Sequence, residues 1–178
     1  MSKNHRDILL HALALLVVLG LTILLLIYRN EVSKLGIYGY PGILLISILA
    51  NATIIVPVPG ILITTAMGAV FNPIGVALAA GVGSAIGELT GYLAGFGGQP
   101  IVEKKKWYIK VKSWMQKYGD ITIFTLSLIP NPLFDIAGMA AGTLKMPIWR
   151  FLVACFLGKF LKMIIFAFLG AKIFAMFS

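Results

Sequence analysis

The sequence predicts an all-α integral membrane protein, and three observations indicate this fold class. Hydrophobic residues make up 60% of the 178 residues and charged residues only 12%, far from the balance of a soluble domain. About three apolar runs are long enough to cross a bilayer as full helices. Two further apolar runs are interrupted by proline pairs, which predicts two re-entrant helical hairpins. With one amphipathic interfacial helix, these segments form a single transmembrane domain over residues 1–178.

The first apolar run, residues 8–28, predicts a transmembrane helix that the mature protein keeps. Its apolar stretch covers about 30 Å of helix, the thickness of a hydrocarbon core. A signal peptide is the alternative, but Leu24–Tyr28 has no small-residue cleavage pattern.

Residues 41–71 predict the first re-entrant hairpin. Pro57, Pro59 and Gly60 break this run, and each half is too short to span a bilayer. Broken backbone at membrane depth is tolerated only where protein or a water-filled cavity surrounds it. Asn72 and the proline after it then predict a turn into the next helix.

Residues 74–97 predict a full transmembrane helix with a stripe of small residues and a polar stripe. The glycines recur at every fourth position, at Gly83, Gly87, Gly91 and Gly95. They predict a groove for close helix packing, as does Gly138 further along, with a direct ligand role as the alternative. Glu88 shares one face with Ser84 and Tyr92, which makes it an acid inside an otherwise apolar helix.

Residues 100–118 predict an amphipathic helix at the membrane surface. Its apolar residues fall at helical spacing, at Trp107, Val111, Trp114, Met115 and Tyr118. The lysines of this segment place it on the cytoplasmic side, and we expect a prokaryotic inner membrane. Three single spans with two hairpins then put the N-terminus inside and the C-terminus outside, and hairpins that cross the membrane would alter this count.

Residues 121–144 predict the second re-entrant hairpin. Pro130 and Pro132 break it, and Asn131 suits the N-cap of the returning half-helix. Asp135 follows on that half-helix, so this break is the more polar of the two.

Residues 147–177 predict the last transmembrane helix, and it contains two lysines at depth. Lys159 lies near the midplane and is a candidate partner for an anionic headgroup or a carboxylate, with snorkelling to water as the alternative. Lys162 occupies the position that matches Glu88, but helix lengths place the two at different depths and argue against an ion pair.

Two carboxylates are expected at similar depth, roughly 8 Å from the cytoplasmic edge for Glu88 and roughly 9 Å for Asp135. If they share a cavity, they form a proton or cation site. The alternative is that each satisfies free amides at a hairpin tip or pairs with a lysine.

The two hairpins match one another at offsets of 73 or 74 residues. Pro57 and Pro59 correspond to Pro130 and Pro132, and Gly68 and Pro73 correspond to Gly142 and Pro147. Hairpins that enter from opposite sides make this an inverted repeat, an arrangement found in many transporters.

These residues resemble the VTT-domain superfamily, which includes the bacterial DedA proteins, over roughly Pro57–Gly170. The matching motifs are Pro57-Val58-Pro59-Gly60, the run Gly83-x3-Gly87-Glu88-x2-Gly91-Tyr92-x2-Gly95, and Pro130-x-Pro132 followed by Ala137-Gly138 and an aromatic residue at Trp149 or Phe151. The resemblance implies two opposed re-entrant hairpins and lipid flipping or scrambling. Here Gly60-Ile61 lacks the acid, and Ser127–Leu133 lacks the arginines, that DedA proteins usually carry.

Enzyme chemistry and cofactor binding find no support in the sequence. The two histidines lie near the N-terminus, and Cys155, the single cysteine, excludes an intrachain disulfide and a cysteine-based metal cluster. No nucleophile elbow or phosphate-binding glycine loop occurs. The net charge of +9 flanks apolar segments, which favours anionic lipids over nucleic acid as partners.

The leading hypothesis is a lipid flippase or scramblase with a polar path between the hairpins. Its pathway residues are Glu88, Tyr92, Asn131, Asp135 and Lys159. One alternative is a proton- or cation-coupled transporter of a small solute that uses the two carboxylates. Another is a non-transporting assembly protein, and a homo-oligomer is also open.

Overall fold

The structure is a computed structural model that describes residues 39–52, 60–97, 106–131 and 133–176. Every element in these ranges is an α-helix. The helices are α3 (Gly39–Ala52), α4 (Gly60–Gly68), α5 (Pro73–Gly87), α6 (Leu89–Phe96), α7 (Lys106–Tyr118), α8 (Asp120–Leu128), α9 (Leu133–Thr143) and α10 (Ile148–Ala175). The first predicted span, 8–28, and the breaking residues Pro57, Pro59 and Pro132 lie outside the described residues.

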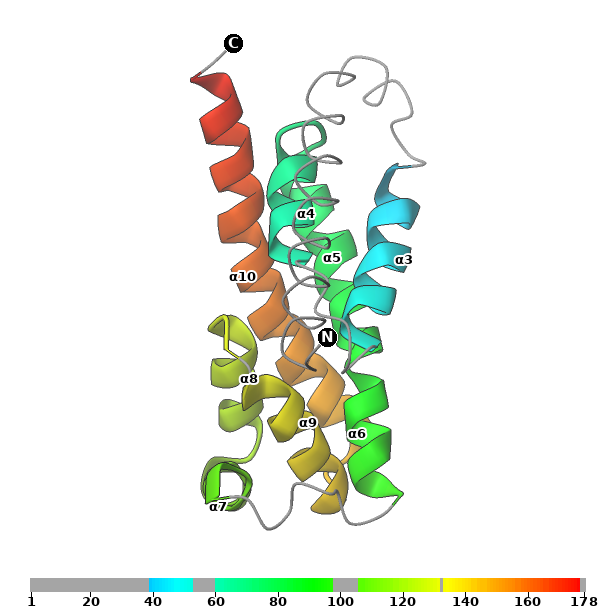
Figure 1. Cartoon of the computed structure of the whole chain (residues 1–178), viewed down its shortest axis with the longest axis vertical. Helices are drawn as coiled ribbons and strands as arrows, with labels where there is room; N and C mark the ends of the chain where they lie inside the picture. Colours follow the sequence, from blue (N-terminus) through cyan, green and yellow to red (C-terminus); the bar gives the residue numbers. More distant parts are fainter. Residues whose placement is uncertain (1–38, 53–59, 98–105, 132, 177–178) are drawn as a thin grey trace, which may run out of the picture.

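Two helical stretches run along the length of the molecule (Figure 1). The helix pair α5–α6 covers 24 residues and α10 covers 28, and both are apolar enough to cross a membrane. At 1.5 Å per residue they extend over about 36 Å and about 42 Å, more than a hydrocarbon core requires. Within the described residues, these two stretches are the candidate membrane spans, and α10 packs directly against α5.

The start of α5 follows from the turn that the sequence predicts. The Asn72 side chain accepts hydrogen bonds from the backbone N–H groups of Ile74 at 2.9 Å and Gly75 at 3.3 Å. Pro73 occupies the first turn, where its missing N–H leaves no hydrogen bond unmade.

The full-length helix predicted over residues 74–97 is present as one candidate span, Pro73–Phe96, with an interruption at a single residue, because α5 ends at Gly87 and α6 begins at Leu89. The Thr90 hydroxyl donates to the Gly87 carbonyl at 3.0 Å and so competes with the helical ladder there. Glycine before the break also favours an interruption, since it has low helix propensity. The Glu88 N–H still donates to the Ser84 carbonyl at 3.1 Å, so the interruption is local.

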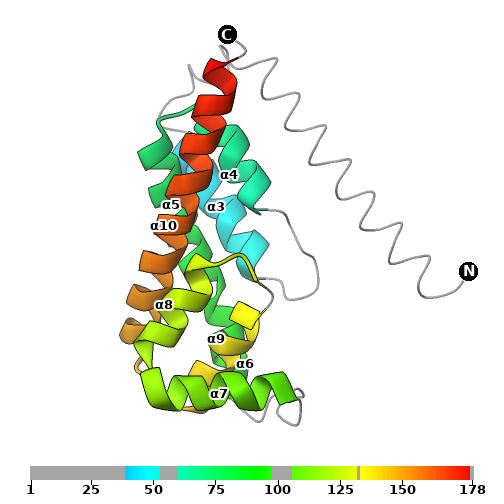
Figure 2. The same ribbon diagram turned by 90° about the vertical axis from the view of Figure 1, so that its left-hand side faces the viewer.

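Two pairs of short helices lie at opposite ends of the long helices (Figures 1 and 2). The pair α3 and α4 lies beside α5 and the C-terminal half of α10. The pair α8 and α9 lies beside α6 and the N-terminal half of α10. The inner ends of the two pairs therefore approach the middle of the molecule from opposite directions.

Helix α7 lies across the end of the molecule that carries α8 and α9 (Figure 2). Its buried residues are Tyr108, Val111 and Met115, one stripe at helical spacing. Trp107 and Tyr118, which the sequence assigns to the same apolar face, are exposed. Tyr108 is buried instead, and its hydroxyl donates to Thr143 Oγ1 at 3.0 Å.

The glycines of α5 and α6 allow two different helices to approach closely. A Cβ atom at Gly87 would lie 2.5 Å from the Ile48 carbonyl of α3, and one at Gly83 would clash with the Leu44 carbonyl. A Cβ atom at Gly95 would clash with the Met139 carbonyl of α9. Helices of the same chain therefore occupy this groove, so nothing in the described part leaves it open for a partner helix.

The apolar core has two parts with a polar layer between them. One part contains Tyr92, Phe151 and Cys155, and the other contains Ile43 and Met163. Along α10, the buried polar residues fall between Cys155 and Met163. This layer lies at the level where the two short helix pairs meet.

Candidate functional site

A buried ion pair forms the centre of the polar layer. The Lys159 ammonium on α10 donates to Glu88 Oε1 at 2.6 Å, at the interruption between α5 and α6. The side chains of Lys159 and Glu88 are only 6% and 5% exposed. Removing two charges from water is costly, so a buried pair of this kind needs further polar partners.

Asn51 on α3 supplies those partners. Its side-chain oxygen accepts a hydrogen bond from Lys159 Nζ at 2.8 Å. Its amide nitrogen donates to Ser84 Oγ at 3.1 Å and to the Ser47 carbonyl at 2.8 Å. The Lys159 ammonium also lies 4.7 Å from the centre of the Phe134 ring on α9, within cation–π range. Residues of both short helix pairs and both long helical stretches thus meet at one cation.

A cavity of about 300 Å³ adjoins this network. Its lining includes Asn51 at the end of α3, Gly60 at the start of α4, Pro130 and Asn131 at the turn between α8 and α9, and Lys159 on α10. The cavity therefore lies where the inner ends of the two helix pairs face one another. Its volume is at the small end of the range for ligand pockets, about 300–1,000 Å³.

Lys162 is the second lysine that lines the cavity. It is only 8% exposed, yet no hydrogen bond or ion pair joins it to any described residue. Its electrostatic neighbours include Lys159, Glu88 and Asp135. The cavity wall thus carries one lysine that a carboxylate neutralises and one that lacks such a contact.

Asn131 holds the turn between α8 and α9 together. Its amide nitrogen donates to the carbonyls of Leu126 at 2.9 Å and Ile129 at 2.7 Å, and its oxygen accepts from the Leu133 N–H at 2.9 Å. These bonds satisfy backbone groups that a broken helix leaves free. Its side chain is thereby committed to the turn while it lines the cavity.

Asp135 and Tyr92 lie next to this site rather than in its wall. Asp135 is exposed in the first turn of α9, and among the described residues neither it nor Glu88 lines the cavity. Tyr92 is buried, and its hydroxyl donates to the Met146 carbonyl at 2.6 Å while its ring packs on Phe151. The Tyr92 contacts support the packing of α6 against the start of α10.

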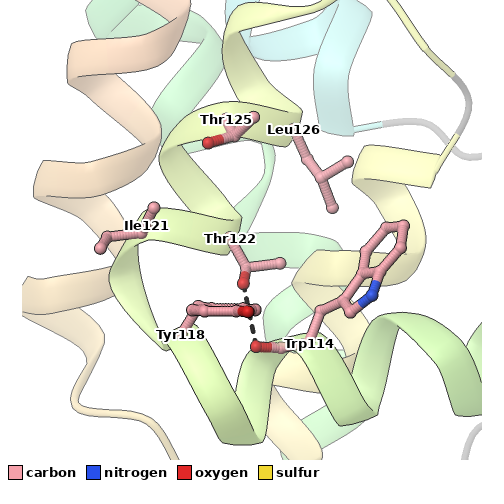
Figure 3. Close-up of a pocket in the computed structure, with 6 residues that line it drawn as sticks. All are labelled: Trp114, Tyr118, Ile121, Thr122, Thr125 and Leu126. Atoms are coloured by element: carbon pink, nitrogen blue, oxygen red, sulfur yellow. Dashed lines mark hydrogen bonds between the residues drawn. The ribbon is translucent and has the colours of Figure 1, made fainter.

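A second pocket lies between α7 and α8 (Figure 3). Its volume is about 200 Å³, and no charged residue is among those that line it. The Thr122 hydroxyl points to the Trp114 carbonyl and donates to it at 3.1 Å. In the part of the chain that the structure describes, no group of three histidine, cysteine or acidic side chains is placed to hold a metal ion. The cavity with the two lysines is therefore the candidate site.

Sequence patterns do not single out Asn51, and they suggest Lys162 only as a rejected partner of Glu88. The signal for Asn51 is a lone amide, four residues after Ser47, in an apolar run. Its meaning depends on α3 crossing α5 at Gly87, which periodicity along one helix cannot indicate.

Comparison with known proteins identifies the family. The model of the VTT domain matches residues 58–172. Among curated proteins, the Arabidopsis thaliana vacuole membrane protein KMS2 is 33% identical over 98 residues, covering 44% of this chain and 24% of that protein. Human vacuole membrane protein 1 is 32% identical over 102 residues, covering 44% and 25%. Undecaprenyl phosphate transporter A of Bacillus subtilis (strain 168) is 30% identical over 109 residues, covering 56% and 54%. No solved structure matches the chain.

The chain belongs to the VTT-domain family, which confirms the resemblance seen in the sequence. It is therefore a protein of a membrane family whose named relatives are membrane proteins and a transporter, not enzymes. The chain spans between about a quarter and about half of the length of these relatives.

Proposed function

We propose that this protein moves lipids between the two leaflets of a membrane, as a flippase or scramblase for phospholipid or polyprenyl-phosphate headgroups. The observation that carries the proposal is the cavity between the two helix pairs, with Lys159 and Lys162 in its wall. Cations at this depth attract an anionic headgroup, while the acyl chains remain in the bilayer. The name of the Bacillus subtilis relative, a transporter of a polyprenyl phosphate, supports the same class of cargo.

The short helix pairs act in this proposal as re-entrant hairpins. Helices α4 and α8 have nine residues each, or about 14 Å, less than half of a hydrocarbon core. They cannot cross alone, and the described inner ends of both pairs line the cavity inside the protein, where broken backbone is tolerated. The lysines of α7 support a cytoplasmic location for that end of the molecule.

Matching contacts support an inverted repeat. Gly68 of α4 meets the Ala167 backbone of α10, and Gly142 of α9 meets the Tyr92 backbone of α6. Gly142 follows Gly68 by 74 residues, and Ala167 follows Tyr92 by 75 residues. In the same way, α3 packs on Gly83 of α5 and α8 packs on Gly158 of α10. The first helix of each hairpin thus packs on the long helix that follows that hairpin in the chain. The second helix of each hairpin packs on the other long helix.

Reconstitution into liposomes with fluorescent headgroup-labelled lipids tests the proposal. We expect transbilayer movement above that of protein-free vesicles, and we expect Glu88→Gln to reduce it because Lys159 loses its carboxylate. Lys172→Gln is the control, since Lys172 is an exposed lysine at the far end of α10. Movement at the protein-free rate for several lipid classes would refute the proposal.

A second candidate is ion-coupled transport of a small solute. It is favoured by the approach of α9 to α6, where the Asp135 carbonyl lies 3.6 Å from the Cβ position of Gly91, one turn from Glu88. Uptake that follows a pH gradient, with lipid distribution unchanged, would favour this candidate over lipid transport. Loss of that uptake in both Glu88→Gln and Asp135→Asn would assign the coupling to the two carboxylates.

A further inference from the structure

The charges that line the cavity, or directly contact its lining, do not balance. Lys159 and Lys162 in the wall each bring a positive charge, and Glu88, which lies outside the wall, brings a negative charge that directly contacts Lys159. One positive charge is left over, and it belongs to Lys162, which no described residue contacts through a hydrogen bond or ion pair. Asp135 influences Lys162 electrostatically but is exposed on α9, outside the described lining of the cavity.

An ammonium group buried without a contacting anion is an unfavourable feature of a fold. The other polar groups of the lining are already used, because Asn51 bonds Ser47, Ser84 and Lys159, and Asn131 bonds its own turn. Among the described residues, Lys162 is therefore a donor without a hydrogen-bond partner, and α4 begins at Gly60, which lines the same cavity. Both features favour an anion in the cavity.

We propose that Lys162 anchors one singly charged phosphodiester group of a phospholipid, and that Glu88 sets this charge preference by neutralising Lys159. The inference rests on the proposed function and specifies the cargo of the same cavity. A phosphodiester brings one negative charge and balances Lys162. A phosphomonoester brings up to two, and its second charge would be repelled by Glu88 behind the wall, in a medium of low dielectric constant.

The first test measures binding in detergent solution at pH 7.0, without transport. The ligands are dihexanoyl phosphatidylglycerol, a diester, and dihexanoyl phosphatidic acid, a monoester. We expect the wild type to prefer the diester and Lys162→Met to lose at least about tenfold in affinity for both. Lys172→Gln, an exposed lysine on the same helix, is expected to bind as the wild type does.

A reversal of the preference between diester and monoester is the more decisive result. Glu88→Gln leaves two positive charges in the wall, so the preference is expected to shift towards the monoester by about tenfold or more. The double variant Glu88→Gln/Lys159→Gln restores one positive charge, so the preference is expected to return to the diester although affinity falls. An unchanged preference in Glu88→Gln would overturn the proposal, as would unchanged affinity in Lys162→Met.

Stability measurements separate a lost site from a lost fold. Lys162→Met removes a buried charge that has no contacting anion, so its melting temperature is expected to equal or exceed that of the wild type. A large decrease in melting temperature would mean that Lys162 is structural and would overturn its assignment as the anchor. If Glu88→Gln does not fold, the double variant and Lys162→Met still decide the outcome.

Two further measurements identify the source of the anion and distinguish a failure of the Lys162 assignment from a failure of the transport proposal. Glycerophosphoglycerol, the same headgroup without acyl chains, is expected to bind much more weakly than the lipid. Equal binding would assign the site to a soluble phosphodiester and overturn the lipid assignment. Predicted binding preferences without lipid movement in liposomes would refute the transport proposal alone, whereas lipid movement that is insensitive to Lys162→Met would refute this inference alone.

Discussion

Two ion pairs in the described part of the protein differ mainly in their burial. Glu88 and Lys159 are almost fully buried, whereas Asp120 and Arg150 form a pair at 2.8 Å with side chains 39% and 45% exposed. Water and salt screen the exposed pair, whereas the buried lysine is largely shielded from the water that could replace a lost carboxylate. The same chemical contact therefore has different energetic consequences at the two sites.

Substitution of each acid tests this difference at the level of single residues. Glu88→Gln is expected to lower the free energy of unfolding by roughly 3–5 kcal/mol, because Lys159 stays buried without its anion. Asp120→Asn is the matched control and is expected to cost roughly 0–1 kcal/mol. Chemical unfolding in mixed micelles measures both, and equal losses would contradict the structural account of the buried pair.

How far the sequence predicts the site depends on the kind of residue. Glu88 and Lys159 stand out because charged residues inside apolar runs are costly, and a carboxylate partner is one of the options that the sequence leaves open for Lys159. The choice between that partner and water depends on where α10 crosses the interruption after Gly87, which is tertiary information. The role of Asn51 is harder still to predict from the sequence, because an isolated asparagine has no periodic signal of its own.

At the level of helices, glycines determine which elements approach one another. Gly83 and Gly87 face α3, while Gly91 and Gly95 face α9. The four-residue spacing predicts a groove but not that two different helices share it. The interruption at Glu88 divides the two halves of the stripe.

A pair of alanine substitutions tests the packing of this stripe. Gly87→Ala places a Cβ atom 2.5 Å from the Ile48 carbonyl and is expected to destabilise the fold by roughly 1–3 kcal/mol. Gly42→Ala on α3 meets nothing within 4 Å and is expected to be neutral or stabilising, since alanine favours helix. Thermal unfolding in detergent compares them, and a loss at Gly42 as large as that at Gly87 would refute close packing as the role of Gly87.

For the whole molecule, the all-helical class and the family follow from the sequence, and the described helices and the family match bear them out. The inverted repeat and the re-entrant hairpins remain proposals. Helix α7 and the C-terminal end of α10 lie at opposite ends of the molecule (Figure 1). In the proposed topology they therefore lie on opposite sides of the membrane.

Cysteine labelling from each side of the membrane tests this topology. In a Cys155→Ser background, Lys117→Cys is expected to react only from the cytoplasmic side and Met176→Cys only from the opposite side. Both residues are exposed, so reagent access is limited by the membrane rather than by the fold. Labelling of both from the same side would exclude α10 as a membrane-spanning helix in the proposed orientation.

We propose that lipid headgroups pass through the cavity between the two helix pairs, where Lys162 binds them. The most direct measurement is the rate of transbilayer phosphatidylglycerol movement in proteoliposomes that contain equal amounts of wild type, Lys162→Met or Lys172→Gln. We expect the wild type and Lys172→Gln to move lipid at the same rate. We expect Lys162→Met to remain folded and to move lipid at close to the protein-free rate. Equal rates for a folded Lys162→Met and the wild type would contradict it.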